Sequence, residues 1–462
     1  MALSSEQAAL VTKLNMQLDS LGREDDRLGK YYQGAQRLEH IGLAVPPELR
    51  RFEMCANWNR VAVDSVEQRQ RVKTFMLPGE DTSSTLLREH WDANNLDSES
   101  RLLHRDTLIY GRGFVCVGTN AEDAEHPLIT VESPREMVAD VDPRTRRIRS
   151  ALRAYGGTTE DPTPQFATLY EPNSTVWLEK RAGSWVETDR DNHNLGRVPI
   201  VLFLNRRRTG AWTGESEMTD VIPLVDAAAR SLTGLQLAAE TIIAPKRYVL
   251  GVTKGDFVDA DGNPLPAWEA YFGALWANQN ADAKVGQLPG ADLGNFHKTA
   301  EHYGQLVSSV TGLPLRYLGQ NSVNPAAEGA IRADESRLVL NVEAKNDNIG
   351  DGWGWVQGIA ERFRTGEWPK ANQIKTEWHD PGTPTFAQKA DALQKMHGGG
   401  PIVSREGSWD ELGWSDARKD RERGYFEAEA QDPYLARLDA KDDDGAANGS
   451  GDGAGVLGGA AV

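Results

Sequence analysis

The chain has 462 residues, of which 39% are hydrophobic and 26% charged; this is enough for about three domains and typical of a folded protein. Its formal net charge of −17 excludes a protein whose main task is to grip nucleic acid through a basic surface, although an acidic wall still lets DNA slide past. The two cysteines, Cys55 and Cys116, lack metal-ligand spacing and predict neither a disulfide framework nor a zinc site.

The N-terminal part of the sequence predicts three helices. Residues 5 to about 40 carry leucines at helical spacing up to Gly22, where we expect the helix to be interrupted. A second helix is expected over residues 48–72, and a third after Pro78-Gly79 that includes Trp91.

From Leu108 onward the pattern changes to short runs rich in β-branched and aromatic residues, separated by turn residues. The predicted strands cover residues 113–118, 128–131, 167–170, 176–179 and 200–204. This part of the chain is therefore predicted to be a mixed α and β domain.

Two long helices are predicted in the middle of the chain. Apolar residues recur every three or four positions over 220–243, with Pro223 in the first turn, where its missing N–H costs little. A strand-like RYVLGV follows, and a second helix begins at the capping residue Asp292 and ends at Gly312. The two helices flank a segment of about forty residues. We therefore predict that the helices lie side by side and carry this segment at one end, as a stalk with a tip.

Residues 318–327 form a polar loop that leads into a helix extending to about Phe363, which we expect Gly350, Gly352 and Gly354 to loosen. Two helical pieces are predicted between 385 and 435, around a Gly-Gly-Gly-Pro sequence. Beyond Leu438 almost nothing can be buried, so disorder is expected.

Enzyme signatures are missing from the sequence. It contains no GxxxxGK[ST] phosphate loop, HExxH, GxSxG or CxxC. Gly111, Gly113 and Gly118 do not have dinucleotide-fingerprint spacing, and His297 and His302 lie on different helix faces. We predict no catalytic residues, no metal and no cofactor.

Two basic runs have two possible interpretations. They are Arg144, Arg146, Arg147, Arg149 and Arg153, and then Arg206, Arg207 and Arg208. They either contact phosphates or, in a ring of acidic subunits, pair with neighbouring Asp and Glu or stay solvated. The second interpretation is favoured because both runs adjoin strands and turns.

The N-terminus lacks the basic-then-apolar order of a secretory signal, and no run approaches the roughly 18 apolar residues of a membrane span. We therefore expect no membrane partner.

Residues 214–251 and 311–338 resemble the portal proteins of tailed phages, in the family typified by the portal of phage SPP1. The first stretch (GESEMTDVIPLVDAAARSLTGLQLAAETIIAPKRYVLG) looks like a first stem helix. The second (TGLPLRYLGQNSVNPAAEGAIRADESRL) looks like the passage from a second stem helix through a tunnel loop into a long wing helix. Residues 104–118 and 388–415 agree more loosely, and the resemblance, which lies in order and spacing, covers roughly 10–435.

The resemblance implies an α+β portal fold with a mixed α/β wing, a two-helix stem, a small α/β clip, a long wing helix and a helical crown. The implied boundaries are N-terminal helices and wing 1–213, first stem helix 214–245, clip 246–290, second stem helix 291–312, tunnel loop 313–327, long wing helix 328–365, C-terminal wing and crown 366–436, and a disordered acidic Gly-rich tail 437–462.

The function implied is that of a non-enzymatic dodecameric ring at one capsid vertex, forming the channel for packaging and ejection of double-stranded DNA. The implied partners are further copies of the chain, the terminase large subunit, head–tail connector or adaptor proteins, and the major capsid and scaffolding proteins. The location is the virion, after assembly in the host cytoplasm. The alternative is a head–tail adaptor or scaffold protein without a channel, which would differ from a portal ring in size.

Three groups of candidate site residues follow from the resemblance. The tunnel-loop residues that face DNA are Gln320, Asn321, Ser322, Val323 and Asn324. The stem packing residues are Val225, Leu232, Leu235, Ile242, Phe296, Tyr303 and Val307. The clip residues expected to bind partners are Trp268, Tyr271, Phe272 and Trp276.

Overall fold

The computed structural model describes residues 3–36, 54–77, 79, 84–158, 160–243, 247–250, 284–287, 294–320, 328–382, 386–397, 402–414 and 416–431. The chain divides into two units, Met1–Gly382 and Thr383–Val462. Helices and strands are both well represented, so the expected α+β class is confirmed.

The helices of the first unit are α1 (Ser5–Gln33), α2 (Trp58–Glu67), α3 (Thr85–Ala93), α4 (Leu96–Tyr110), α5 (Ile222–Ile243), α7 (Gly294–Thr311) and α8 (Glu328–Thr365), with 3-10 turns η3 (Leu315–Leu318) and η4 (Ala371–Gln373). The second unit contains α9 (Phe386–His397), α10 (Arg405–Glu411) and α11 (Asp416–Gln431). Within the described residues, no helix is long and apolar enough to cross a membrane.

The strands are β1 (Val72–Met76), β2 (Arg112–Gly118), β3 (Leu128–Glu132), β4 (Met137–Val141), β5 (Ile148–Tyr155), β6 (Phe166–Tyr170), β7 (Thr175–Arg181), β8 (Ser184–Asp191), β9 (Ile200–Leu204), β10 (Arg247–Leu250), β11 (Lys284–Gln287) and β12 (Lys375–Trp378). They form antiparallel sheets in the orders β3-β2-β9, β4-β5-β6-β7-β8, β1-β12 and β10-β11.

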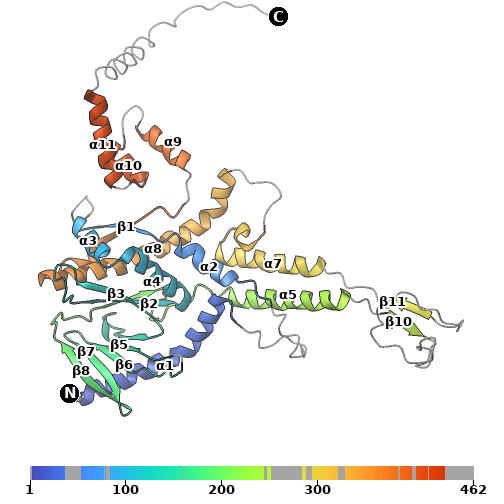
Figure 1. The fold of residues 1–462 in the computed structure, drawn as a ribbon, viewed down its shortest axis with the longest axis horizontal. Coiled ribbons are helices and arrows are strands. Elements are labelled where there is room, and N and C mark those ends of the chain that lie inside the picture. Colours follow the sequence, from blue (N-terminus) through green and yellow to red (C-terminus); the bar gives the residue numbers. More distant parts are fainter. Residues whose placement is uncertain are drawn as a thin grey trace, which may run out of the picture. The chain divides into compact units, whose positions relative to one another are not determined.

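The two larger sheets share a core. Phe114 of β2, Met137 of β4 and Ile200 of β9 are buried together, which joins the three-stranded sheet to the five-stranded one. Helix α1 covers the five-stranded sheet, where its Leu14 is buried with Leu152 of β5 (Figure 1). The apolar face of the helix, formed by residues at 3.6-residue spacing, thus packs against the inward-facing side chains of the strands.

Helix α8 forms the largest core with the three-stranded sheet and the β1–β12 pair. Trp353 of α8 is fully buried and stacks edge-on against Trp91 of α3, with ring centroids 4.7 Å apart. Phe203 of β9 and Phe75 of β1 complete this cluster. Two aromatic rings in this geometry stabilise the core beyond their buried area, by about 0.5–1.5 kcal/mol.

The prediction that Gly22 interrupts the first helix is wrong, because α1 continues through it to Gln33. A glycine inside a helix costs only about 1 kcal/mol. Here Leu18 before the glycine and Leu28 after it are both buried, and that packing outweighs the cost. The helix ends at Gly34, whose φ of 71° is the left-handed conformation typical of a C-cap.

The glycines of α8 do not loosen it, contrary to the expectation, since the helix is continuous from Glu328 to Thr365. Gly350, Gly354 and Gly358 follow one another at four-residue intervals and face η4 and β12. A Cβ at Gly354 would lie 2.6 Å from the Ile374 carbonyl oxygen, and one at Gly358 would overlap Ala371. The glycines therefore permit close approach of the returning chain.

Other boundaries were predicted less well. The second helix starts at Trp58, after a non-helical segment from Met54 to Asn57, and residues 48–53 lie outside the described part. Three helices, where two were expected, occupy the C-terminal unit. The predictions also missed several elements, namely α4, β1, β4, β5, β8, β11 and β12.

Candidate functional site

We call α1–α4, α8 and the three sheets other than β10–β11 the α/β body. Helices α5 and α7 lie side by side, so that the chain leaves this body along α5 and returns along α7 (Figure 1). They approach closely at Gly234, where an added Cβ would lie 3.5 Å from the Phe296 ring. We call α5 and α7 the helix pair. Between the two helices, the described residues form the antiparallel β10–β11 strands.

The helix pair joins the body through a buried apolar cluster. Val225 near the start of α5 and Val307 near the end of α7 are completely buried. They pack in one cluster with Val63 of α2 and Leu338 of α8. Because this core comes from four helices far apart in sequence, the orientation of the helix pair is fixed by the body of the same chain.

The remaining predicted packing residues lie farther along the pair and are less buried. Leu232, Leu235, Phe296 and Tyr303 are partly exposed. Ile242 lies in the last turn of α5, and its side chain is outside the described part.

Two apolar side chains of α7 remain on the surface. Leu306 is 36% exposed and Val310, one turn later, is 43% exposed. On α8, Leu340 is 64% exposed, on the face opposite the buried Leu338 and Val342. A single chain therefore leaves apolar positions of α7 and α8 uncovered.

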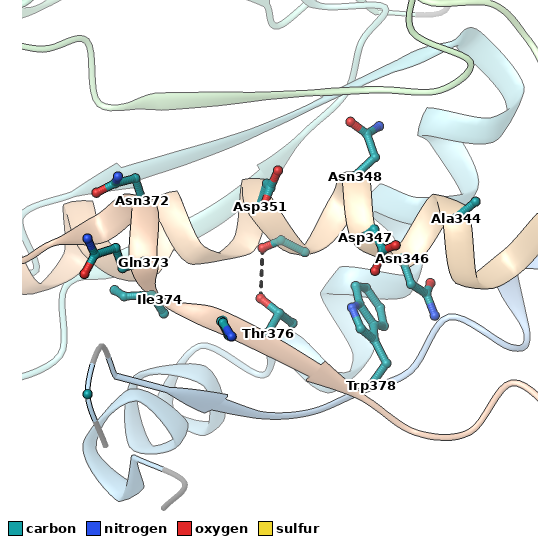
Figure 2. Close-up of a pocket in the computed structure, with 13 residues that line it drawn as sticks. Ala344, Asn346, Asp347, Asn348, Asp351, Asn372, Gln373, Ile374, Thr376 and Trp378 are labelled. Atoms are coloured by element: carbon teal, nitrogen blue, oxygen red, sulfur yellow. Dashed lines mark hydrogen bonds between the residues drawn. The ribbon is translucent and has the colours of Figure 1, made fainter. Parts of the chain in front are cut away.

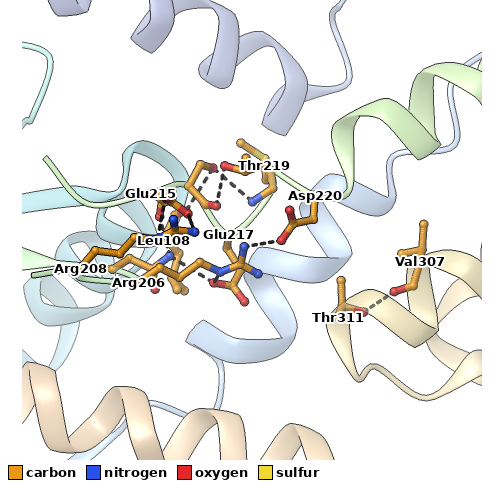
Figure 3. A network of polar contacts seen from close by, with 12 residues as sticks. Leu108, Arg206, Arg208, Glu215, Glu217, Thr219, Asp220, Val307 and Thr311 are labelled. Atoms are coloured by element: carbon orange, nitrogen blue, oxygen red, sulfur yellow. Dashed lines mark hydrogen bonds and ion pairs between the residues drawn. The ribbon is translucent and has the colours of Figure 1, made fainter. Parts of the chain in front are cut away.

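A buried ionic network fixes the segment that leads into α5. The Lys345 ammonium of α8 lies 2.8 Å from a carboxylate oxygen of Glu217 and donates to the Asn205 side-chain oxygen at 2.6 Å. Arg206 reaches both Glu217, at 3.3 Å, and Asp220, at 2.6 Å (Figure 3). Burial opposes the charge of Glu217, but Lys345 and Arg206 outweigh it and hold its pKa below the usual value.

A second ionic cluster ties the first part of the candidate tunnel loop to α8. Within the loop, Arg316 pairs with Asp334, at 2.8 Å, and with Glu335 of α8, and Tyr317 donates to Glu335 at 2.8 Å. Arg69, after α2, lies 3.3 Å from Glu335. Burial opposes the charge of Glu335, yet the Tyr317 hydrogen bond and the two arginines hold its pKa below the usual value.

Of the predicted loop residues, Gln320 is the one within the described part. Its side-chain nitrogen donates to the Glu301 carbonyl oxygen of α7 at 2.6 Å. Asn321, Ser322, Val323 and Asn324 lie outside the described residues, as do the clip residues Trp268, Tyr271, Phe272 and Trp276.

The basic runs are partly neutralised within the chain itself. Arg153 pairs with Glu132 at 2.7 Å, and Arg149 with Asp140 at 3.3 Å. Arg206 belongs to the Glu217 network, and Arg208 pairs with Glu215 at 3.1 Å. These four arginines thus pair with acidic residues of their own chain. Asp140 lies on the strand next to that of Arg149, whereas Glu132 lies in the other of the two larger sheets from Arg153.

A cavity of about 920 Å³ lies between α8 and the segment containing η4 and β12 (Figure 2). Its lining is rich in amides and includes Asn346, Asn348, Asn372 and Gln373, together with Asp351. In the parts of the chain that are described, no group of three or more His, Cys, Asp or Glu is placed to hold a metal ion.

Sequence reasoning did not find Glu217, Lys345 or Glu335, because nothing local distinguishes a buried charged residue from an exposed one. The α8 glycines had a signal, since Gly350, Gly354 and Gly358 share one helix face.

Comparison with known proteins identifies relatives over most of the chain. The "Portal protein" of Mycobacterium phage D29 is 37% identical over 413 residues, which covers 87% of this chain and 84% of the relative. The "Portal protein" of Mycobacterium phage L5 matches with the same identity and coverage.

Among solved structures, a chain from the neck of an empty gene transfer agent particle has a TM-score of 0.42 at 13% identity, covering 81% of this chain and 94% of that one. A chain from the native particle's virion gives 0.41 at 16%, covering 80% and 93%.

The family described as "Phage portal protein, SPP1 Gp6-like" matches residues 25–433. Together with the two phage relatives, this match spans the α/β body, the helix pair, α8 and the helices of the second unit. The chain therefore belongs to the SPP1 Gp6-like family of phage portal proteins.

Proposed function

We propose that this portal protein assembles into a closed homo-oligomeric ring, a dodecamer, whose central channel carries double-stranded DNA into and out of the capsid. The observation that supports assembly best is the uncovered apolar surface of α7 and α8. Leu306, Val310 and Leu340 would be removed from water by a neighbouring copy, at a gain of about 25 cal/mol per Å² of apolar area. A repeated head-to-tail contact of this kind closes into a ring when its rotation divides a full turn evenly.

In this proposal the helix pair is the stem and α8 the long wing helix. Residues 246–290 are the clip, where Trp268, Tyr271, Phe272 and Trp276 bind the terminase large subunit during packaging and connector or adaptor proteins afterwards. The N-terminal wing and the C-terminal crown face major capsid and scaffolding proteins. Assembly takes place in the host cytoplasm, and the chain itself catalyses no reaction.

The tunnel loop is proposed to face the DNA. The sequence has no Lys or Arg between Arg316 and Arg332, and Asn321 and Asn324 offer uncharged hydrogen-bonding groups. Each charged phosphate contact would strengthen binding and slow a moving duplex, so a neutral loop lets DNA pass. The ionic cluster around Glu335 supports this role, because it anchors the first part of the loop to α8.

The loop assignment is tested by changing Asn321 and Asn324 to Lys and measuring DNA packaging into procapsids at low and moderate salt. We expect rings to form normally and packaging to slow or stall, with partial relief as salt rises. Packaging at the wild-type rate at both salts would show that the loop does not face DNA.

The ring assignment is tested by light scattering on the variant with Leu306→Asp and Val310→Asp, with Met16→Asp as the control. Met16 is 66% exposed on the part of α1 that packs on the five-stranded sheet. A charge on a buried interface is costly, so the double variant should dissociate and the control should not. An adaptor without a channel would give a small particle for the wild type as well.

A further inference from the structure

Four arginines from three separate segments line one cleft on the α/β body. Arg146 and Arg147 lie in the turn between β4 and β5, Arg197 precedes β9, and Arg207 follows it. Together with Trp212 and Trp355 they line a cavity of about 250 Å³. Arg146, Arg207 and Trp212 also line a second cavity, of about 350 Å³. We call the cleft that these four arginines line the arginine cleft.

The arginines of the cleft differ from their neighbours in charge pairing. Arg149, Arg206 and Arg208 each have a carboxylate partner, as described above. Within the described part of the chain, the four cleft arginines have no ion pair with a carboxylate. Asp351 of α8 also lines the first of the two cavities, so the local charge is about +3 in a chain whose net charge is −17.

Aromatic rings support two of the unpaired guanidinium groups. The Arg197 guanidinium carbon lies 3.7 Å from the centre of the Trp355 ring, and that of Arg207 lies 5.1 Å from the centre of Trp212. Stacking fixes the plane of a guanidinium and leaves its N–H edge free to meet an anion. The cleft therefore presents oriented donors.

The cleft concentrates positive charge at an energetic cost. Burial and then repulsion from Arg147 lower the pKa of Arg197 to about 10. Arg146 has a φ of +58°, in the left-handed region that glycine or asparagine normally occupies in a turn. An arginine in this conformation costs the backbone roughly 1–3 kcal/mol, and strain of this kind clusters at binding sites.

We propose that the arginine cleft binds the phosphate backbone of double-stranded DNA. Duplex DNA carries about one negative charge per 1.7 Å of its axis, so several phosphates reach the cleft together and match its excess charge. One carboxylate of a neighbouring protein would leave most of that charge unbalanced, and guanidinium forks match phosphate oxygens in pairs. This inference extends the proposed function, because it adds a DNA contact outside the channel loop.

The test uses the purified full-length protein and fluorescence anisotropy of a labelled blunt DNA duplex over a series of salt concentrations. Arg147→Gln with Arg207→Gln removes two cleft charges, both on exposed residues. Arg144→Gln is the matched control, because it is exposed in the same turn and lines neither cavity. Light scattering on each variant reports whether the ring still forms.

We expect the double variant to bind DNA more weakly, with the slope of log K against log salt reduced by about 0.9 for each phosphate that is no longer neutralised, or about 1.8 in total. The control should keep the wild-type slope. An unchanged slope in the double variant would overturn the proposal. A smaller particle with an unchanged slope would assign the cleft to a neighbouring copy instead. If the wild type forms a ring that does not bind the duplex, this inference fails and the proposed ring stands.

Discussion

Changing Glu217 to Gln tests the buried network that fixes the start of α5. The substitution keeps the shape of the side chain but leaves the Lys345 ammonium without its carboxylate, 2.8 Å away, in a largely buried position. Removing one partner of a buried ion pair costs about 3–5 kcal/mol. Unfolding entropy is about 2.1 cal/mol/K per residue, or roughly 0.8 kcal/mol/K for the unit Met1–Gly382. We therefore expect the midpoint of thermal unfolding to fall by about 4–6 °C.

Glu215→Gln is the matched control, because Glu215 is two residues away and pairs with Arg208, whose side chain is 75% exposed. An exposed pair contributes less than about 1 kcal/mol, so the midpoint should fall by at most about 1 °C. Adding Lys345→Met to Glu217→Gln should recover most of the loss, since no unpaired charge remains. Scanning calorimetry makes the measurement. Equal midpoints for Glu217→Gln and Glu215→Gln would refute the assignment of a buried, stabilising network.

The pH dependence of the Glu217 effect has a definite sign. The pKa of Glu217 is lower in the folded than in the unfolded chain, so its ionisation stabilises the fold above the unfolded pKa, and this contribution is lost as the pH falls through the folded pKa. The difference between wild type and Glu217→Gln should therefore shrink in acid.

Three further outcomes are expected. Gly358→Ala should destabilise the fold by about 1–3 kcal/mol in chemical denaturation, because the new Cβ would overlap Ala371. Gly329→Ala, in open space on the same helix, should instead stabilise the fold by about 0.5–1 kcal/mol. Equal effects of the two substitutions would refute the close approach at Gly358. Burial lowers the pKa of His104 to about 3, so below about pH 6.5 the unfolded chain binds a proton that the folded chain excludes. The free energy of unfolding should therefore fall by up to about 1.4 kcal/mol per pH unit in acid. His104→Gln should flatten that dependence, which calorimetry between pH 4 and 7 measures. Truncation after Leu438 should leave the number of subunits per particle, measured by light scattering, unchanged, since the removed segment has almost nothing to bury. Loss of assembly would give that segment a structural role.

The long helices were predictable because their periodic apolar faces are a local property of the sequence. α1, α5, α7 and α8 all follow a 3.6-residue pattern, and caps such as Ser4 of α1 mark their ends. Buried central strands were equally visible, as in β2, where the apolar GFVCVG is enclosed between β3 and β9.

The missed strands obtain their stability from partners that are distant or polar. β1 pairs with β12, about 300 residues later, and neither is long enough to show a pattern by itself. β5 alternates arginines with apolar residues, and its Arg149 and Arg153 led us to treat the segment as a basic run. Pairing with acids such as Glu132 on another strand is a tertiary property.

The site was predictable in outline and not in its contacts. Sequence periodicity located the helix pair and its apolar positions, but Val225 and Val307 are buried by α2 and α8 of the same chain, which no local pattern reveals. The Glu217–Lys345 contact joins residues 128 positions apart. Such pairs depend on how the elements pack, so they required the structure.

Electron-microscope images of the purified wild-type chain, viewed end on, test the central claim most directly. The account predicts closed rings with rotational symmetry and a central hole, built by contacts that cover Leu306, Val310 and Leu340. Particles the size of one or two chains, without a hole, at concentrations where portal rings persist, would contradict it.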